Sequence, residues 1–377
     1  MRRGTKIQKL KQALPRIVKD VRHYAKPRVK LHNEGLGDYY TEGYRSLNQR
    51  EWKGVRDTAY DFASWLKVYG YMAVTLGKHP VALTKSFVRY PWMASYLTVA
   101  NMLDRHKLGL RGKQLRYTQE QFYGVVHNSV DVIAKIIERD ENLNSPNNKR
   151  AAKLRAKTVM FDEMTPSIIM AGFPMLDWID IAMSPVCLPG EVDQNANIMY
   201  VDAAERMGLA ADVCPLPSAE VGCAIVDDYP QVGSSFITSS MPCDGSLGAA
   251  LFMDRYMKKL PSFTLTPPQR FNEPETNAYA VKDLKNCIRF IEETYHVKWD
   301  WDAFWEKAEE YNKTTQCMLD KWDVNCTPYP QVIGSALSLQ REYEFQTAAC
   351  LDPFMTKQDE KVTKMMLKGY EKDREAD

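Results

Sequence analysis

Beyond residue 150, short apolar runs alternate with turns and helical patterns, and this alternation is the strongest constraint on the fold. The stretch KTVMFDEMTPSIIMAGF, residues 157–173, indicates a strand, a loop and a helix. The stretch GCAIVDDYPQVGSSFITSSMPCDG, residues 222–245, contains one or two buried strands, and LPSFTLTPP, residues 260–268, indicates a further strand that ends at two prolines. Because strands that alternate with helices favour a mostly parallel sheet, we expect an α/β fold.

Helical patterns flank this region on both sides. Residues 50–140 are aromatic-rich and show apolar residues at helical spacing, and residues 276–325 are typical of a helical pair. In the second helix of that pair we expect one buried stripe, formed by Phe304, Ala308, Tyr311, Thr315, Met318 and Trp322. The last residues, 355–377, indicate a charged amphipathic helix that runs out into solvent.

A polar cluster, NLNSPNNKR, marks a boundary near residues 143–150. We therefore divide the chain into a basic arm with a helical extension, an α/β lobe and a helical segment, at residues 1–150, 151–275 and 276–377.

Charge is unevenly distributed along the chain. The net charge of +2 provides no overall attraction to nucleic acid. The first thirty residues nevertheless carry eleven Lys or Arg and one acid, Asp20, which indicates either a solvated arm or an arm that binds an acidic partner or a membrane surface. The solvated arm is the favoured interpretation, and we find neither a secretory signal nor an apolar run of membrane-spanning length. We therefore expect a cytoplasmic protein without membrane contact.

Eight cysteines in a cytoplasmic chain argue against disulfides. No CxxC pair occurs, which argues against a zinc ribbon and a thioredoxin-type dithiol, so any metal site must combine distant positions. Cys223, Cys287 and Cys317 lie in apolar surroundings and are interpreted as small core residues.

Two other cysteines are candidate ligands. Cys243 stands where a buried strand passes into a helix, in SSMPCDGSLGA, and a helix N-terminus stabilises the thiolate that binds metal. Cys214 ends a loop after Gly208 and is followed by two prolines that stiffen the backbone. On the residues alone, packing and ligand binding both remain open for these thiols. Dinucleotide-binding, P-loop and nucleophile-elbow motifs are not found, and a Cys–His nucleophilic pair has little support.

The order of these segments resembles the 2-hydroxyacyl-CoA dehydratase and benzoyl-CoA reductase superfamily. The resemblance rests on NIMYVDAAERMGLAADVCPLPSAEVG, on FITSSMPCDGSLGAALFMDRYMKKLPSFTLTPP, and on VKDLKNCIRFIEETYHVKWDWDAFWEKAEEYNKT. It covers residues 150–345 and is closer to the larger-subunit type.

The resemblance implies flavodoxin-like lobes that carry a [4Fe-4S] cluster held by three cysteines. The first two ligands of the family match Cys214 and Cys243. PGEVDQNAN resembles the family's loop beside the substrate, which makes Glu191 a candidate polar group there, and a solvated loop acid is the alternative interpretation. The third cysteine of the family lies in a second α/β lobe that this chain is expected to lack. A third ligand could come from another chain, from Cys350 or from a group other than cysteine.

For function, the resemblance implies an iron–sulfur subunit that works with a related α/β subunit and an ATP-dependent iron–sulfur activator. Such enzymes pass one low-potential electron to a CoA thioester, and dehydratases of this type then lose water. Two alternatives are a subunit of the benzoyl-CoA reductase type and a non-catalytic scaffold or electron-relay subunit. A further hypothesis is a metal-free structural protein whose cysteines pack in the core.

Overall fold

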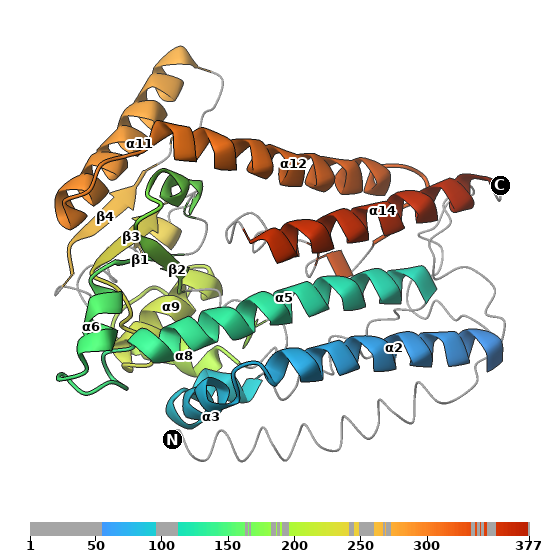
Figure 1. Ribbon diagram of the computed structural model, residues 1–377, viewed down its shortest axis with the longest axis horizontal. Helices are drawn as coiled ribbons and strands as arrows, with labels where there is room; N and C mark the ends of the chain where they lie inside the picture. The colour runs from blue at the N-terminus through green and yellow to red at the C-terminus, as the bar shows by residue number, and fades with distance from the viewer. Residues whose placement is uncertain are drawn as a thin grey trace. The chain divides into compact units, whose positions relative to one another are not determined.

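The computed structural model divides the chain into two compact units (Figure 1). One, the helical unit, comprises residues Met1–Pro80, Tyr96–Val130 and Glu310–Asp377, and the other, the α/β unit, comprises Val81–Ser95 and Asp131–Glu309. The structure describes residues 55–95, 112–162, 165, 167–181, 186, 189–190, 196–240, 245–248, 260–266, 268, 273–332, 336–337, 340, 343–344 and 352–375.

The helical unit is built from long helices: α2 (Val55–Leu76), the first part of α5 (Gly112–Arg139), the second part of α12 (Trp301–Asn325), and α14 (Pro353–Glu375). Its core cluster consists of Leu115, Tyr117, Val332, Ala336, Val362 and Met366. Because α14 contributes to this core, the expectation that the terminal helix runs out into solvent is wrong. The helix carries a buried stripe at Met355, Gln358, Asp359, Val362, Thr363, Met366, Gly369 and Asp373.

A buried charged network lies inside the helical unit. Lys321 of α12 is fully buried, and its Nζ lies 2.5 Å from Asp359 Oδ1 and 3.2 Å from Glu344 Oε1. Glu344 also accepts hydrogen bonds from Trp322 Nε1 at 2.8 Å and from Gln340 Nε2 at 3.1 Å. Burial raises the pKa of Asp359 above its ordinary value, whereas the Lys321 ammonium lowers it. One buried cation is thus shared by two carboxylates.

The α/β unit contains a parallel sheet of strands β1 (Thr158–Phe161), β2 (Asp177–Asp180), β3 (Ser235–Ser239) and β4 (Ser262–Leu265), in the order β2-β1-β3-β4. All residues of β1 and β3 are buried, as expected for central parallel strands covered on both faces. The order is that of the first four strands of a flavodoxin-like sheet, so the predicted fold class is confirmed.

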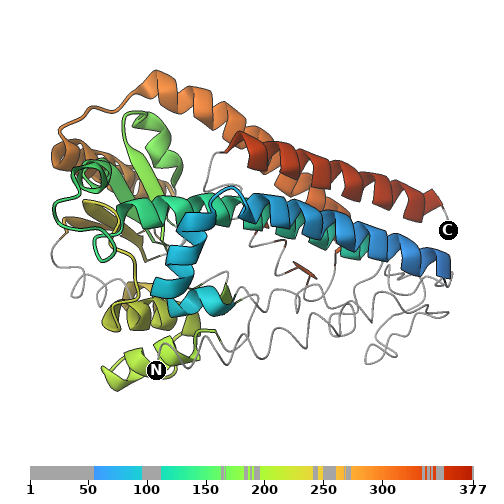
Figure 2. The same ribbon diagram turned by 60° about the horizontal axis from the view of Figure 1, so that its bottom comes forward.

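Helices cover both faces of this sheet (Figures 1 and 2). Cys287 and Ile291 of α11 (Pro274–Tyr295) pack in one core cluster with alternate strand residues Val159, Phe161 and Ile237. Phe236 stands next to Ile237 and therefore faces the other side, where its ring contacts Tyr229. Figure 1 shows α11 on one side of the strands and α9 (Pro215–Ile225) with α8 (Ile198–Arg206) on the other. The smaller elements are α3 (Pro80–Arg89), α6 (Lys149–Arg155) and the 3₁₀ helix η4 (Ser167–Gly172).

One sequence expectation is confirmed and another needs correction at this level. Of the one or two buried strands expected in residues 222–245, one forms among the described residues, at 235–239, and the apolar GCAIV lies at the end of helix α9. The helical pair is confirmed, but the six stripe residues of α12 are half-buried, and the fully buried ones are Thr314, Lys321 and Val324.

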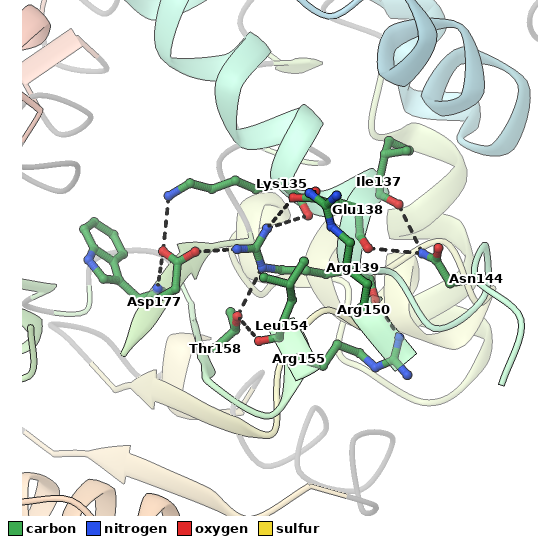
Figure 3. A network of polar contacts seen from close by, with 11 residues as sticks. Lys135, Ile137, Glu138, Arg139, Asn144, Arg150, Leu154, Arg155, Thr158 and Asp177 are labelled. Carbon is green, nitrogen blue, oxygen red and sulfur yellow. Dashed lines mark hydrogen bonds and ion pairs between the residues drawn. The ribbon is translucent and has the colours of Figure 1, made fainter. Parts of the chain in front are cut away.

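The end of α5 is tied to the sheet by Arg139 (Figure 3). This side chain is only 5% exposed, and its Nη2 donates to Asp177 Oδ2 at 2.5 Å while its Nε donates to Thr158 Oγ1 at 3.2 Å. Lys135, one turn earlier, also reaches Asp177 at 3.2 Å. The guanidinium therefore connects α5 to the first residues of both β1 and β2. Helix α6 is linked to the same residue, because Arg155 donates to the Arg139 carbonyl at 2.8 Å.

Helices α8 and α9 approach each other at the backbone. A Cβ added at Gly222 would stand 1.7 Å from the carbonyl oxygen of Tyr200, which no side chain could tolerate without a shift of one helix. Close approach of main chains is a recurrent reason for glycine inside a helix. Just after α9, the buried Asp228 accepts a hydrogen bond from the Tyr200 hydroxyl at 3.4 Å and pairs with Arg89 at 3.3 Å.

No helix in the described part of the chain is both long and apolar enough to cross a membrane.

Replacing Lys321 by Met should destabilise the protein strongly. The change leaves Asp359 and Glu344 buried without their cation, and breaking a buried ion pair from one side typically costs about 3–5 kcal/mol. Without Lys321 the pKa of the Asp359 carboxyl must rise further above its ordinary value, so this group binds its proton more tightly in the folded state than in the unfolded state. The loss of unfolding free energy caused by Lys321→Met should therefore become smaller as the pH falls from 7 towards 4. Urea unfolding curves recorded across that pH range measure it.

The matched control is Lys364→Met on α14, where an exposed lysine lies 3.6 Å from Glu360. This change should alter the unfolding free energy by less than about 0.5 kcal/mol at any pH. Equal effects of the two substitutions at pH 7 would show that the Lys321 network does not stabilise the fold.

Candidate functional site

The topology of the sheet points to the carboxyl ends of β1 and β3. The chain passes from β1 to β2 on one side and then to β3 on the other, so the strand order reverses between β1 and β3. In open α/β sheets, ligands bind outside the carboxyl ends of the strands at such a reversal. We therefore take this edge as the candidate site.

Parallel pairing continues one residue beyond each of these strands. The Asp162 amide donates to the Ile237 carbonyl at 3.0 Å, and the Ser240 amide donates to the Leu265 carbonyl at 2.8 Å. Ser240 therefore stands at the carboxyl end of β3, on the strand that flanks the reversal point. Cys243 itself lies outside the described residues, but residues 245–248 are helical. The predicted succession of strand and helix is thus confirmed on either side of Cys243, while its role remains a prediction.

Cys214 is the N-cap residue of α9, with extended backbone angles of φ −50° and ψ 132°. It is an exposed, free cysteine, and Pro215 follows it at the first helical position. The Cys214 carbonyl accepts from the Ser218 amide at 3.3 Å and from Ser218 Oγ at 2.9 Å. The proline and these two hydrogen bonds fix the backbone of Cys214, and its side chain remains accessible at the positive end of the helix dipole.

The direction of α9 places Cys214 towards the carboxyl edge. Helix α9 leads into β3, which pairs in parallel with β1, and a helix that connects parallel strands of one sheet runs antiparallel to them. The first turn of α9 is therefore expected at the carboxyl edge. Tyr229, which follows α9, is fully buried, and its pKa is raised well above the ordinary value by burial and by the carboxylates of Asp162, Glu220 and Asp180.

Sequence reasoning did not identify Asp162, Glu220 and Tyr229 as buried polar residues of the α/β unit. Asp162 could have been identified from the sequence, because an acid directly after a buried strand marks the carboxyl edge of a sheet. Tyr229 and Glu220 could not, since their burial arises only when α9 packs on the sheet.

The core assignment of two other cysteines is confirmed. Cys223 and Cys287 are fully buried; burial raises the pKa of the Cys223 thiol well above its ordinary value and that of Cys287 to about 12. Cys317 is half-buried, so its assignment as a core residue holds only in part, and Cys326 is exposed.

Glu191 and Cys350 lie outside the described residues. A hydrogen bond links the chain before Glu191 to the chain after it. Asn197 Nδ2 donates to the Val186 carbonyl at 3.0 Å. A Cβ at Gly190 would stand 2.9 Å from the same Nδ2. The ends of the loop are therefore close together, and the assignment of Glu191 to a substrate site remains a prediction.

The sheet order and the site at its reversal define the class of protein: an α/β protein with a flavodoxin-like lobe. Residues 192–353 match the family model described as 2-hydroxyglutaryl-CoA dehydratase, D-component. The match includes Cys214, Cys243, strands β3 and β4 and both helices of the pair, and it confirms the resemblance to the 2-hydroxyacyl-CoA dehydratase superfamily over this segment. No curated protein matches the chain significantly.

In the reduced, metal-free protein, exposed cysteines should be alkylated much faster than buried ones. Cys214 and Cys326 are exposed and should react rapidly with iodoacetamide at pH 8. Cys287, with a pKa of about 12, has a thiolate fraction roughly 10³-fold below that of a cysteine with the ordinary pKa of 9. Mass spectrometry of timed samples should therefore find Cys223 and Cys287 modified only after unfolding. Rapid labelling of Cys287 in the folded protein would contradict the burial described above.

Proposed function

We propose that this chain is an iron–sulfur subunit of a 2-hydroxyacyl-CoA dehydratase-like enzyme, and that Cys214 and Cys243 bind a [4Fe-4S] cluster. The observation that supports the proposal is the position of Cys214: an exposed thiol at the N-terminus of α9, the helix that precedes β3 in the chain, inside the segment that matches the dehydratase component. The segment that holds Cys243 follows β3.

The residues present fit such a cluster. Thiolate sulfur is the usual ligand of iron in these centres, and Cys214 offers an accessible thiol on a backbone fixed by proline. Cys223 and Cys287 are enclosed in the core and are excluded as ligands by their burial. When bound, the cluster would supply one electron at low potential. The third ligand is proposed to come from another chain, from Cys350 or from a group other than cysteine.

Within this proposal the protein binds and orients an acyl-CoA substrate beside the carboxyl edge of the sheet. Glu191 would hold a proton at the substrate hydroxyl or at the thioester oxygen, where it would assist the departure of water. The buried strands beneath the edge, with Phe161 and Ile237 fully buried, provide a dry and rigid base for such a site.

The partners follow from the same proposal. The matched family is named as a component of a dehydratase, so we propose a hetero-oligomer with a related α/β subunit. An ATP-dependent iron–sulfur activator would deliver the electron. Turnover measured with the partner subunit, activator, ATP, a reductant and a panel of CoA thioesters distinguishes the dehydratase from a ring-reducing or non-catalytic subunit.

Replacing Cys214 by Ala should remove most of the iron from anaerobically purified protein. The expected result is loss of the brown absorbance and of iron and acid-labile sulfide, because a cluster ligand has been deleted. Cys326→Ala is the matched control, since this cysteine is equally exposed but lies outside the proposed site. Wild-type iron content in the Cys214 variant would overturn the cluster assignment.

Replacing Glu191 by Gln should lower turnover and leave iron content unchanged. A group that transfers a proton to a reacting oxygen typically contributes about 10²–10⁴-fold, so we expect the rate to fall at least roughly tenfold. Glu293→Gln, a change at an exposed glutamate on α11, serves as the control. A wild-type rate for the Glu191 variant would make this acid a solvated loop residue and would leave the cluster proposal untouched.

A further inference from the structure

Helix α6 and the start of α12 both lie at the amino edge of the sheet in the α/β unit. Helix α6 leads directly into β1. The Tyr295 hydroxyl, at the end of α11, donates to the carbonyl of Thr158, the first residue of β1, at 2.7 Å. The Asp300 amide, just before α12, donates to the Gly172 carbonyl at 2.9 Å, in the segment that leads into β2. Both helices therefore border the same edge of one compact unit.

The start of α12 presents two indole rings to solvent. Trp301 is 53% exposed and Trp305 is 59% exposed, and their rings are stacked with centroids 6.3 Å apart. Inner rings hold them in place, because Trp299 contacts Trp301 at 5.4 Å and also packs on the fully buried Phe173. Large aromatic side chains that are exposed yet already ordered are characteristic of binding surfaces, since little further conformational entropy is lost when a partner binds.

Carboxylates accompany these indoles on the same side of the helix. The exposed positions among the first nine residues of α12 are Trp301, Asp302, Trp305, Glu306 and Glu309, and we call them the indole–acid face. These five positions hold two indoles, three acids and no base. Indole rings attract cations through their π electrons, and neighbouring carboxylates add to that attraction, so this face has the chemistry to bind Lys or Arg side chains.

Helix α6 and the turn after it have the complementary charge. Residues 149–157 contain five bases and no acid. The exposed bases, which we call the basic face, are Lys149, Arg150, Lys153 and Lys157. Lys149 and Lys153 are four residues apart and therefore project from the same side of the helix. Arg150 already pairs with Glu138 of α5, so the three lysines are the groups that a partner would engage.

We propose that two copies of this chain associate through the amino edges of their α/β units, with the basic face of each copy on the indole–acid face of the other. Charge complementarity selects a second copy, because one rigid edge carries both members of the pair on different helices. A two-fold axis pairs the two faces reciprocally, so both contacts form in a single dimer. Three lysines then meet three carboxylates and two indoles in each contact.

This association does not depend on the proposed iron–sulfur function. It uses the amino edge of the sheet, at the opposite end of the strands from the candidate site. Its contacts are polar and lie at exposed side chains, so screening by salt should weaken it.

The test is sedimentation equilibrium of the full chain in the absence of other subunits. The wild type should dimerise, with a Kd at least about tenfold weaker in 0.5 M than in 0.05 M NaCl. The triple reversals Lys149→Glu/Lys153→Glu/Lys157→Glu and Asp302→Lys/Glu306→Lys/Glu309→Lys should each weaken the dimer at least about tenfold, because like charges then face each other in both contacts. The variant with all six reversals should dimerise about as tightly as the wild type, since complementarity and net charge are both restored.

A control separates the specific contact from a general effect of charge. Lys282, Lys285 and Arg289 are exposed bases on α11, and changing all three to Glu alters the net charge as much as the reversal on the basic face. The Kd of this control should stay within about twofold of the wild type. A wild type that is monomeric at about 0.1 mM, a control that weakens the dimer equally, or a sixfold variant no tighter than the triple variants would each overturn the proposal. Circular dichroism establishes that every variant is folded.

Discussion

The guanidinium of Arg139 holds together the parts of the α/β unit on which the site depends. Its contacts to Asp177 and Thr158 fix the last turn of α5 against the beginnings of β1 and β2. Parallel strands start at one edge and end at the other, so fixing their first residues also fixes where their carboxyl ends lie. The candidate site lies at the other edge, where the strand order reverses between β1 and β3.

Much of this fold could be predicted from local sequence. Residues 158–161, 235–239 and 262–265 are short apolar runs bounded by turn residues, and all three form strands. Strand β2 was not predicted, because DWID alternates polar and apolar residues and half of its positions are acids. GCAIV is as apolar as a strand but continues a helix whose N-terminus is set by two prolines, and propensity alone does not separate the two cases.

The site could be predicted only where its chemistry is carried by single residues. Cys214 and the segment around Cys243 stand at element boundaries, which local patterns reveal. The buried Tyr229, Glu220 and the shared cation Lys321 depend on which helices pack together, and one sequence does not contain that information in readable form. Lys321 illustrates the limit: a lysine in an amphipathic helix normally indicates a solvent-facing position, yet here it is the most deeply buried charge of the helical unit.

The contact between Gly222 and the Tyr200 carbonyl has a consequence for how sequences of this type can diverge. Because α8 and α9 touch through their main chains, the spacing of the two helices is set by the absence of a side chain rather than by the shape of one. Substitutions at the less buried ends of α9 can accumulate without moving the helix, provided that the buried residues keep their packing and this position stays glycine. The start of α9, and the thiol that caps it, can therefore keep its place relative to the sheet while the surrounding surface is adapted to a different substrate or partner.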